Sequence, residues 1–205
     1  MRRAAAGLAT VALLLIQSLS ASAQEPAASD VSPALERGLA WLAGRQAADG
    51  TWNCRIGYRL NDNYMAKEEH PHVGVTALAG LALLRAGGQE QIAAAGKAAA
   101  WLAKLGGDSP IGYITAHGTR LIEHALAVRF LAEHQAKHPQ PAMEDAVWRG
   151  AGLIVRSQNK EGGWRYQPVA RDADLAFTAP AVEALLAARA AGVEVPEAAL
   201  VAARE

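Results

Sequence analysis

The stretch RGLAWLAGRQAADGTW, residues 37–52, returns as RGAGLIVRSQNKEGGW at residues 149–164, with nothing inserted or lost between its ends. Both copies begin with Arg-Gly and keep a Gln, a Gly and a Trp at the same spacing; these are Gln46, Gly50, Trp52 and Gln158, Gly162, Trp164. A partial copy, KAAAWL, begins at Lys97 and lacks the Gln and the final Trp. Internal repetition of this length indicates stacked helical hairpins, because one hairpin cannot bury its apolar face alone.

The rest of the chain also favours helices, because Ala and Leu carry most of its apolar content. Gly, Pro and Asp punctuate the apolar runs. We expect helices over 34–47, 73–87, 90–105, 118–136, 142–158 and 174–191, with a last one from Pro196, and no strand pair. The second helix of a pair, as in VTALAGLALLRAGG at 75–88, has little charge in its middle. These helices should form the more buried layer and the first helices the wetter one.

The repeated Gln, Gly and Trp have a structural interpretation. A Gln that ends a helix offers its amide to free backbone groups at a neighbouring helix end. Gly permits a sharp turn, and Trp buries a large surface against the next repeat. We therefore interpret Gln46, Trp52, Gln158 and Trp164 as links between hairpins; sugar binding or a cation–π contact by the Trp residues is the alternative.

The pattern Arg/Lys-Gly/Ala-x-x-aromatic-aliphatic-x-x-x-Gln-x-x-x-Gly-x-Trp resembles the QW repeat of squalene and oxidosqualene cyclases, with related repeats in protein prenyltransferase β-subunits. The resemblance covers most of residues 32–205, although Leu153 stands at the aromatic place of the later copy. It implies an all-α fold, an α/α toroid with inner helices around a cavity. Among relatives, the chain is most similar to exported bacterial prenyltransferase/squalene-oxidase-repeat proteins, whose Tyr-x-x-His-Gly stretch has its counterpart in Tyr113 and His117.

Cyclase chemistry needs a strong acid, and the resemblance points to Asp172 and Asp174 for that role. The family motif is Asp-x-Asp-Asp-Thr-Ala, but here Leu175 and Ala176 replace its third Asp and its Thr. A strong acid needs neighbours that stabilise its anion, so the incomplete motif argues against catalysis. The favoured alternative is that Asp174 caps the helix that follows it.

Polar side chains precede each inner helix. His70 and His72 precede the first, His117 the second, and Asp172 and Asp174 the third. In a toroid these helix N-termini share one end of the ring, where their positive dipole ends meet. One interpretation is a site there for an anionic or sugar-like ligand, to which the resemblance adds Tyr113. A metal held by His70, His72, His117 and Asp174 is a second interpretation. The third is that these His and Asp side chains are ordinary cap and loop residues.

The ends of the chain and its bulk properties bound the remaining possibilities. Residues 1–23 have the basic, apolar and small-residue parts of a signal peptide, and we expect cleavage before Gln24. We interpret residues 24–31 as a linker and residues 32–205 as the repeat domain. Basic and acidic residues balance at 20 each, which argues against nucleic-acid binding, and we expect no membrane span after cleavage. Cys54 stands alone, so no internal disulfide is available.

These observations leave three classes of function. The first is an exported toroid that binds a small molecule or a protein without catalysis, and we favour it. The second is a divergent terpene cyclase/mutase-like enzyme with Asp174 as general acid, and the third is a polysaccharide-active toroid. We expect no cofactor, because the zinc motif of the prenyltransferases is not reproduced. The repeats amount to about three and a half hairpins, which indicates an incomplete ring and self-association as one way to cover its edge.

Overall fold

The computed structural model describes residues 28–55, 57–60, 63–66, 69–118 and 120–204. The expected signal peptide, 1–23, and the first part of the linker lie outside these residues. The chain divides into two compact units, Met1–Gly38 and Leu39–Glu205, and helix α2, Ala28–Gly44, runs through the division. This helix begins ahead of Ser32, so the end of the expected linker is helical. Pro33 lies inside this helix, where it lacks the backbone donor that would bond to a carbonyl of the first turn.

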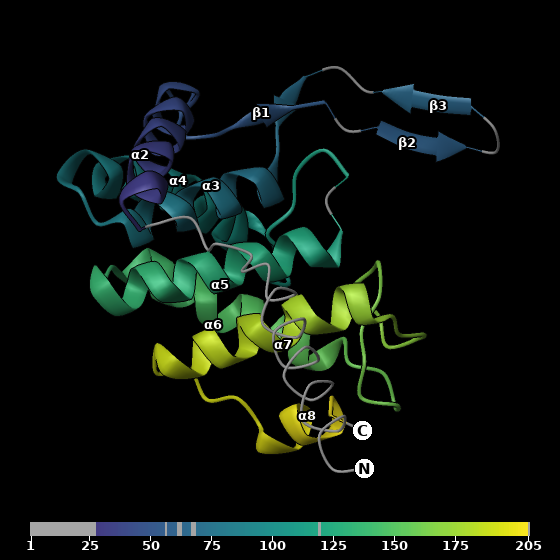
Figure 1. Ribbon diagram of the computed structural model, residues 1–205. Coiled ribbons are helices and arrows are strands. Elements are labelled where there is room, and N and C mark those ends of the chain that lie inside the picture. The colour runs from purple at the N-terminus through teal and green to yellow at the C-terminus, as the bar shows by residue number, and fades with distance from the viewer. Residues whose placement is uncertain (1–27, 56, 61–62, 67–68, 119, 205) are drawn as a thin grey trace, which may run out of the picture. The chain divides into compact units, whose positions relative to one another are not determined.

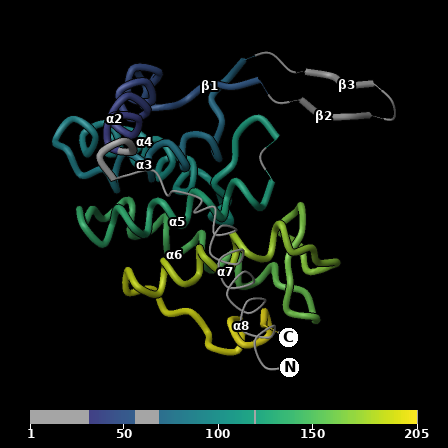
Figure 2. The backbone as a smooth tube through the Cα atoms, viewed as in Figure 1, coloured from purple at the N-terminus to yellow at the C-terminus, as the bar shows by residue number. Residues whose placement is uncertain are grey.

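Six further helices confirm the all-α fold of the larger unit. They follow the sequence prediction to within a few residues: α3 Val73–Ala86, α4 Gln89–Asp108, α5 Leu121–Lys137, α6 Pro141–Arg156, α7 Leu175–Ala190 and α8 Glu197–Ala202. Helix α5 packs between α3 and α7 (Figure 1). Helices α4 and α6 pack against each other; α4 also packs on α3 and α5, and α6 on α5 and α7. The helix pairs α4/α5 and α6/α7 therefore follow one another along the chain, as the backbone tube in Figure 2 shows.

The expectation of no strand pair is wrong. Strand β1, Asn53–Cys54, pairs antiparallel with β4, His70–Pro71, and β2, Gly57–Leu60, pairs antiparallel with β3, Asn63–Ala66. These strands are two to four residues long. Such runs are too short for alternation to stand out in a sequence dominated by helical periodicity.

The burial of the second helices follows the prediction for α3 and α5 but not for α7. Nine residues of α3 and nine of α5 are buried, against four of α7. We name α3, α5 and α7 the inner layer and α4, α6 and α8 the outer layer. Helix α5 contacts both α3 and α7, whereas α7 packs on α5 and leaves Leu175 81% exposed.

The two complete repeats make the same hydrogen bonds. Gln46 Nε2 donates to Gly50 O at 3.0 Å and to Ala94 O of α4 at 2.8 Å. Gln158 Nε2 donates to Gly162 O and to Ala199 O of α8, both at 2.8 Å. The indole N–H groups of Trp52 and Trp164 also match, donating to Leu42 O at 2.9 Å and to Ile154 O at 2.7 Å. Each Gln thus links its own turn to the outer helix of the following repeat.

Gly50 and Gly162 are required by both conformation and space. Their φ angles are +88° and +87°, in the left-handed region that favours glycine. A Cβ at Gly50 would lie 2.7 Å from the backbone of Lys97, and one at Gly162 would lie 1.9 Å from Ala202 O. The turn of each repeat therefore sits directly on the backbone of the next outer helix.

The middle repeat has the same turn built from other residues. Gly112, at φ +77°, lies against the backbone of Arg149, and buried Ile114 takes the place of the Trp. Arg149 donates hydrogen bonds to Gly107 O at 3.2 Å and to Ser109 O. These bonds replace those of the missing Gln, but here the donor lies on the following outer helix and the acceptors lie before the turn. The turn is longer than in the other copies, which hid this equivalence in the sequence.

Candidate functional site

Two of the candidate residues cap helices. His72 Nδ1 accepts a hydrogen bond from Val75 N at 3.2 Å at the start of α3. Asp174 Oδ1 accepts one from Ala176 N at 2.8 Å at the start of α7. The cap interpretation of Asp174 therefore describes its contacts, and the carboxylate also faces the positive end of the helix dipole.

His70 and His117 come together at the entrance to α3 and α5. Their rings meet edge to face with centroids 4.2 Å apart, and His70 Nδ1 is buried with no hydrogen-bond partner among the described residues. Strand pairing with Cys54 holds His70 in place. His117 has a φ of +52°, a conformation that costs energy for any residue with a Cβ. The unpaired Nδ1 atom of His70 and the strained backbone of His117 therefore lie beside each other.

Glu123 and Tyr113 extend this group on the α5 side. Gly74 of α3 leaves room for the Glu123 side chain, whose Cγ would lie 2.8 Å from a Cβ at that position. Burial, together with the charge of Glu123, raises the pKa of Tyr113 to about 12. Burial lowers the pKa of His72, and Glu123 opposes that effect. We name His70, His72, Tyr113, His117 and Glu123 the histidine cluster. Its phenol is protonated near neutral pH.

His124 lies directly behind the histidine cluster and is fully buried. Its Nδ1 accepts from Ile114 N at 3.1 Å, and its Nε2 lies 3.2 Å from Gly150 O of α6. Trp52 N and Trp164 N make the equivalent bond to Thr76 and Thr178, each at 3.1 Å. Because burial lowers the pKa of His124 to about 4, its imidazole is neutral at pH 7 and serves as a packed replacement for threonine.

A second group, which the sequence reasoning missed, stands where α5 and α7 begin. The guanidinium groups of Arg120 and Arg165 lie 5.0 Å and 4.8 Å from the centroid of the Tyr166 ring, which also meets Phe177 edge to face at 4.8 Å. Asp172, one of the expected acids, forms an ion pair with Arg165. We name Arg120, Arg165 and Tyr166, with their partners Phe177 and Asp172, the arginine–tyrosine cluster. Its only sequence signal is that Arg165 and Tyr166 directly follow the Trp of the last complete repeat.

The inner layer carries a network of ion pairs across its three helices. Arg85 of α3 pairs with Glu133 of α5 at 2.7 Å, and Arg129 of α5 pairs with Glu133 at 3.3 Å and with Glu183 of α7. These four residues therefore share one face of the layer.

An apolar surface borders that network on the side of the helix N-termini. Leu78, Leu126 and Ala179 lie one or two turns before charged members of the network, so they share its face. Leu78 is 51% exposed. The inner face therefore carries the ion pairs and, nearer the N-terminal ends of the helices, apolar side chains.

The structure thus brings His70, His72, His117 and Tyr113 together, while Asp172 and Asp174 belong to separate contacts near α7. Within residues 28–204, gaps apart, no three His, Cys, Asp or Glu side chains are placed to hold a metal ion. No helix in the described part of the chain has the length and apolarity needed to cross a membrane. Neither the known family models nor the curated proteins gave a match to this chain.

Proposed function

We propose that the chain is an exported, non-catalytic ligand-binding domain of the squalene cyclase and prenyltransferase repeat type, with its ligand site at the N-terminal ends of α3, α5 and α7. Three turns built on one plan, each seated on the following outer helix, support the repeat identity and the toroid. The composition of residues 1–23 supports export. N-terminal sequencing of the exported protein should then begin at Gln24.

The unpaired, buried Nδ1 of His70 carries the assignment of the site. A buried polar atom without a partner costs free energy that a bound ligand recovers when it supplies the missing hydrogen bond. The strained backbone of His117 lies beside it, and such strain concentrates at binding sites.

The chemistry of the two clusters favours an anionic, hydroxylated ligand with an apolar part. Arg120 adds positive charge at the start of α5, and the aromatic ring of Tyr166 lies beneath its guanidinium. The imidazoles and phenol of the histidine cluster suit hydroxyl groups. The exposed surface of Leu78 suits the apolar part.

The contacts of the acids argue against cyclase chemistry. Asp174 holds the first turn of α7, and Asp172 is paired with Arg165. Each carboxylate therefore has a structural partner, and Leu175 and Ala176 leave the acid motif incomplete.

A pair of matched probes tests this function. Nitrophenyl β-glucuronide should raise the melting temperature, and nitrophenyl β-glucoside, which has a hydroxymethyl group in place of the carboxylate, should raise it less. The Arg120→Gln variant should lose that difference, because the charged contact is gone. Lys137→Gln, at the opposite end of α5, should retain it.

The same probes test the absence of catalysis, because hydrolysis would release coloured nitrophenolate. We expect binding without release. No melting shift with the glucuronide would overturn the proposed site, and a release that Asp174→Asn abolishes would overturn the non-catalytic assignment.

A further inference from the structure

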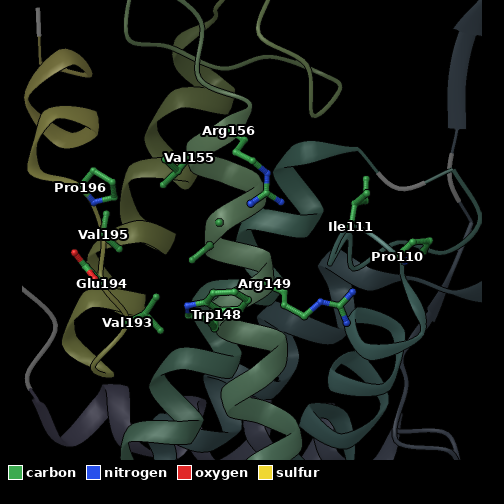
Figure 3. A pocket seen from close by; sticks show the side chains of 12 residues that line it. Pro110, Ile111, Trp148, Arg149, Val155, Arg156, Val193, Glu194, Val195 and Pro196 are labelled. Atoms are coloured by element: carbon green, nitrogen blue, oxygen red, sulfur yellow. The ribbon is translucent and has the colours of Figure 1, made fainter.

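A pocket opens on the outer layer, away from both clusters. It lies between α6 and the segment that joins α7 to α8, and its volume is about 430 Å³, within the range of small-molecule sites. Trp148 and Arg156 contribute from α6, and Val193, Val195 and Pro196 form the opposite wall (Figure 3). The pocket is thus mainly apolar, with one aromatic wall.

Three residues of α6 that line this pocket differ from both other copies of the repeat. Trp148 stands where those copies have Glu36 and Gly96, Gly152 where they have Ala40 and Ala100, and Arg156 where they have Gly44 and Lys104. The three are spaced by four residues, so they share one face of the helix. The turn contacts need none of them, since Gln158, Gly162 and Trp164 make those contacts. These three residues therefore form a part of the pocket lining that the other copies of the repeat do not have.

Gly152 lets the Arg156 side chain lie across α6. A Cβ at Gly152 would stand 3.0 Å from Arg156 Nη1, tighter than ordinary van der Waals contact. Figure 3 shows the Arg156 guanidinium in the middle of the pocket, while the Glu194 carboxylate points away from it. No hydrogen bond or ion pair joins Arg156 to another described side chain, whereas Arg149 is occupied by Gly107 O, Ser109 O and Asp145.

Trp148 supplies a flat apolar surface beside this charge. Its side chain is 64% exposed although it is the largest apolar residue of α6. An exposed indole next to a guanidinium without an acidic partner matches a ligand that has a planar apolar body and an anionic group.

We propose that this pocket is a binding site for small aromatic carboxylates, with the ring between Trp148 and the Val193–Pro196 wall and the carboxylate on Arg156. Arg156 confers the preference for an anion, and Trp148 the preference for a ring. The site is independent of the inner-layer ligand site, which uses other residues on other elements.

Phenylacetate is the probe, phenylacetamide its uncharged analogue, and the indole N–H signals in a proton–nitrogen NMR spectrum are the readout. A Trp148→Phe variant identifies the Trp148 signal among the five tryptophans. Phenylacetate should shift that signal and saturate with a Kd on the order of 1 mM, as expected for a ligand of this size. Phenylacetamide should bind roughly tenfold more weakly, because it lacks the charge-assisted contact.

Two variants test the roles of the residues, and a third is the control. Arg156→Gln should weaken phenylacetate binding roughly tenfold. Gly152→Ala should weaken it as well by displacing the guanidinium, and the helix tolerates alanine at this place in the other two copies. Lys104→Gln, the matching position of α4, should leave the affinity unchanged.

The proposal is overturned by the absence of a saturable shift of the Trp148 signal, by equal affinity for the acid and the amide, or by unchanged affinity in Arg156→Gln. A shift confined to tryptophan signals other than that of Trp148 would place phenylacetate elsewhere on the protein and would equally overturn the proposal. Loss of nitrophenyl glucuronide binding in Arg120→Gln bears on the inner-layer site alone, so the two proposals fail separately.

Discussion

Acid should destabilise the protein through His124, and His124→Thr should remove that sensitivity. The buried ring accepts from Ile114 N through Nδ1, so its proton is on Nε2, facing Gly150 O. A second proton would have to go on Nδ1, where it would meet the Ile114 N–H donor. Thr76 and Thr178 make the same bond in the neighbouring repeats without a titratable group.

The size of the effect follows from the two pKa values. The pKa of His124 is about 4 in the folded protein, against the ordinary value of 6.5. Above pH 6.5 neither state binds the proton, so the stability is fully present. Below 6.5 the unfolded chain binds it first, and stability is lost progressively until the pH reaches the folded value. At about pH 5 the loss comes to about 2 kcal/mol relative to about pH 7.5.

Urea unfolding followed by circular dichroism at these two pH values measures the loss within each protein. This comparison excludes the constant cost of the cavity that threonine leaves. The wild type should lose about 2 kcal/mol more than His124→Thr. His138→Gln, at the end of the same helix, should behave as the wild type because His124 is intact. Equal losses in the wild type and His124→Thr would refute the reasoning.

Three other predictions concern the repeat turns and the cap. Gly162→Ala should lower the free energy of unfolding in urea by more than about 3 kcal/mol, because its Cβ would overlap Ala202 O and would also strain φ. Gly192→Ala, with φ +93° and open space around it, should lower that free energy by only about 1–2 kcal/mol. Equal losses in the two variants would exclude the overlap as a cause. Gln158→Leu should lose about 1–3 kcal/mol with its two hydrogen bonds, and a melting temperature equal to the wild type would contradict that role. Asp174→Asn should be nearly neutral and Asp174→Ala should cost about 1 kcal/mol; a large loss in Asn would mean that the charge does more than cap the helix.

The helices and the repeated turns could be predicted because their signals are local. Spaced Ala and Leu specify helices, and a Gln, Gly and Trp at fixed spacing specify a turn that needs those residue types. The middle turn could not be recognised, because Ile114 and Arg149 perform the same functions from different places in the sequence.

The candidate site was predictable only in part. His70 and His117 each lie just before an inner helix, and the N-terminal ends of these helices were expected to share one end of the fold. The sequence therefore predicted that the two side chains lie close together, as they do. The arginine–tyrosine cluster depends on how the segment after Trp164 folds back, with Tyr166 O accepting from Leu121 N. That contact joins two distant segments and leaves no periodic trace.

The Gln links have a consequence for how the fold comes apart. Gln46 reaches α4 and Gln158 reaches α8, so each turn is joined to the following repeat and to no later one. Coupling of this kind acts between neighbouring repeats only. Breaking one junction therefore leaves the stability of the next junction unchanged. Hydrogen exchange in Gln46→Leu should therefore rise in the turn around Gln46 and in the part of α4 that it contacts, while the amides of α6 stay protected. The molecule would then open by segments, and its least stable junction would set the rate at which a protease or a chaperone first gains access to it.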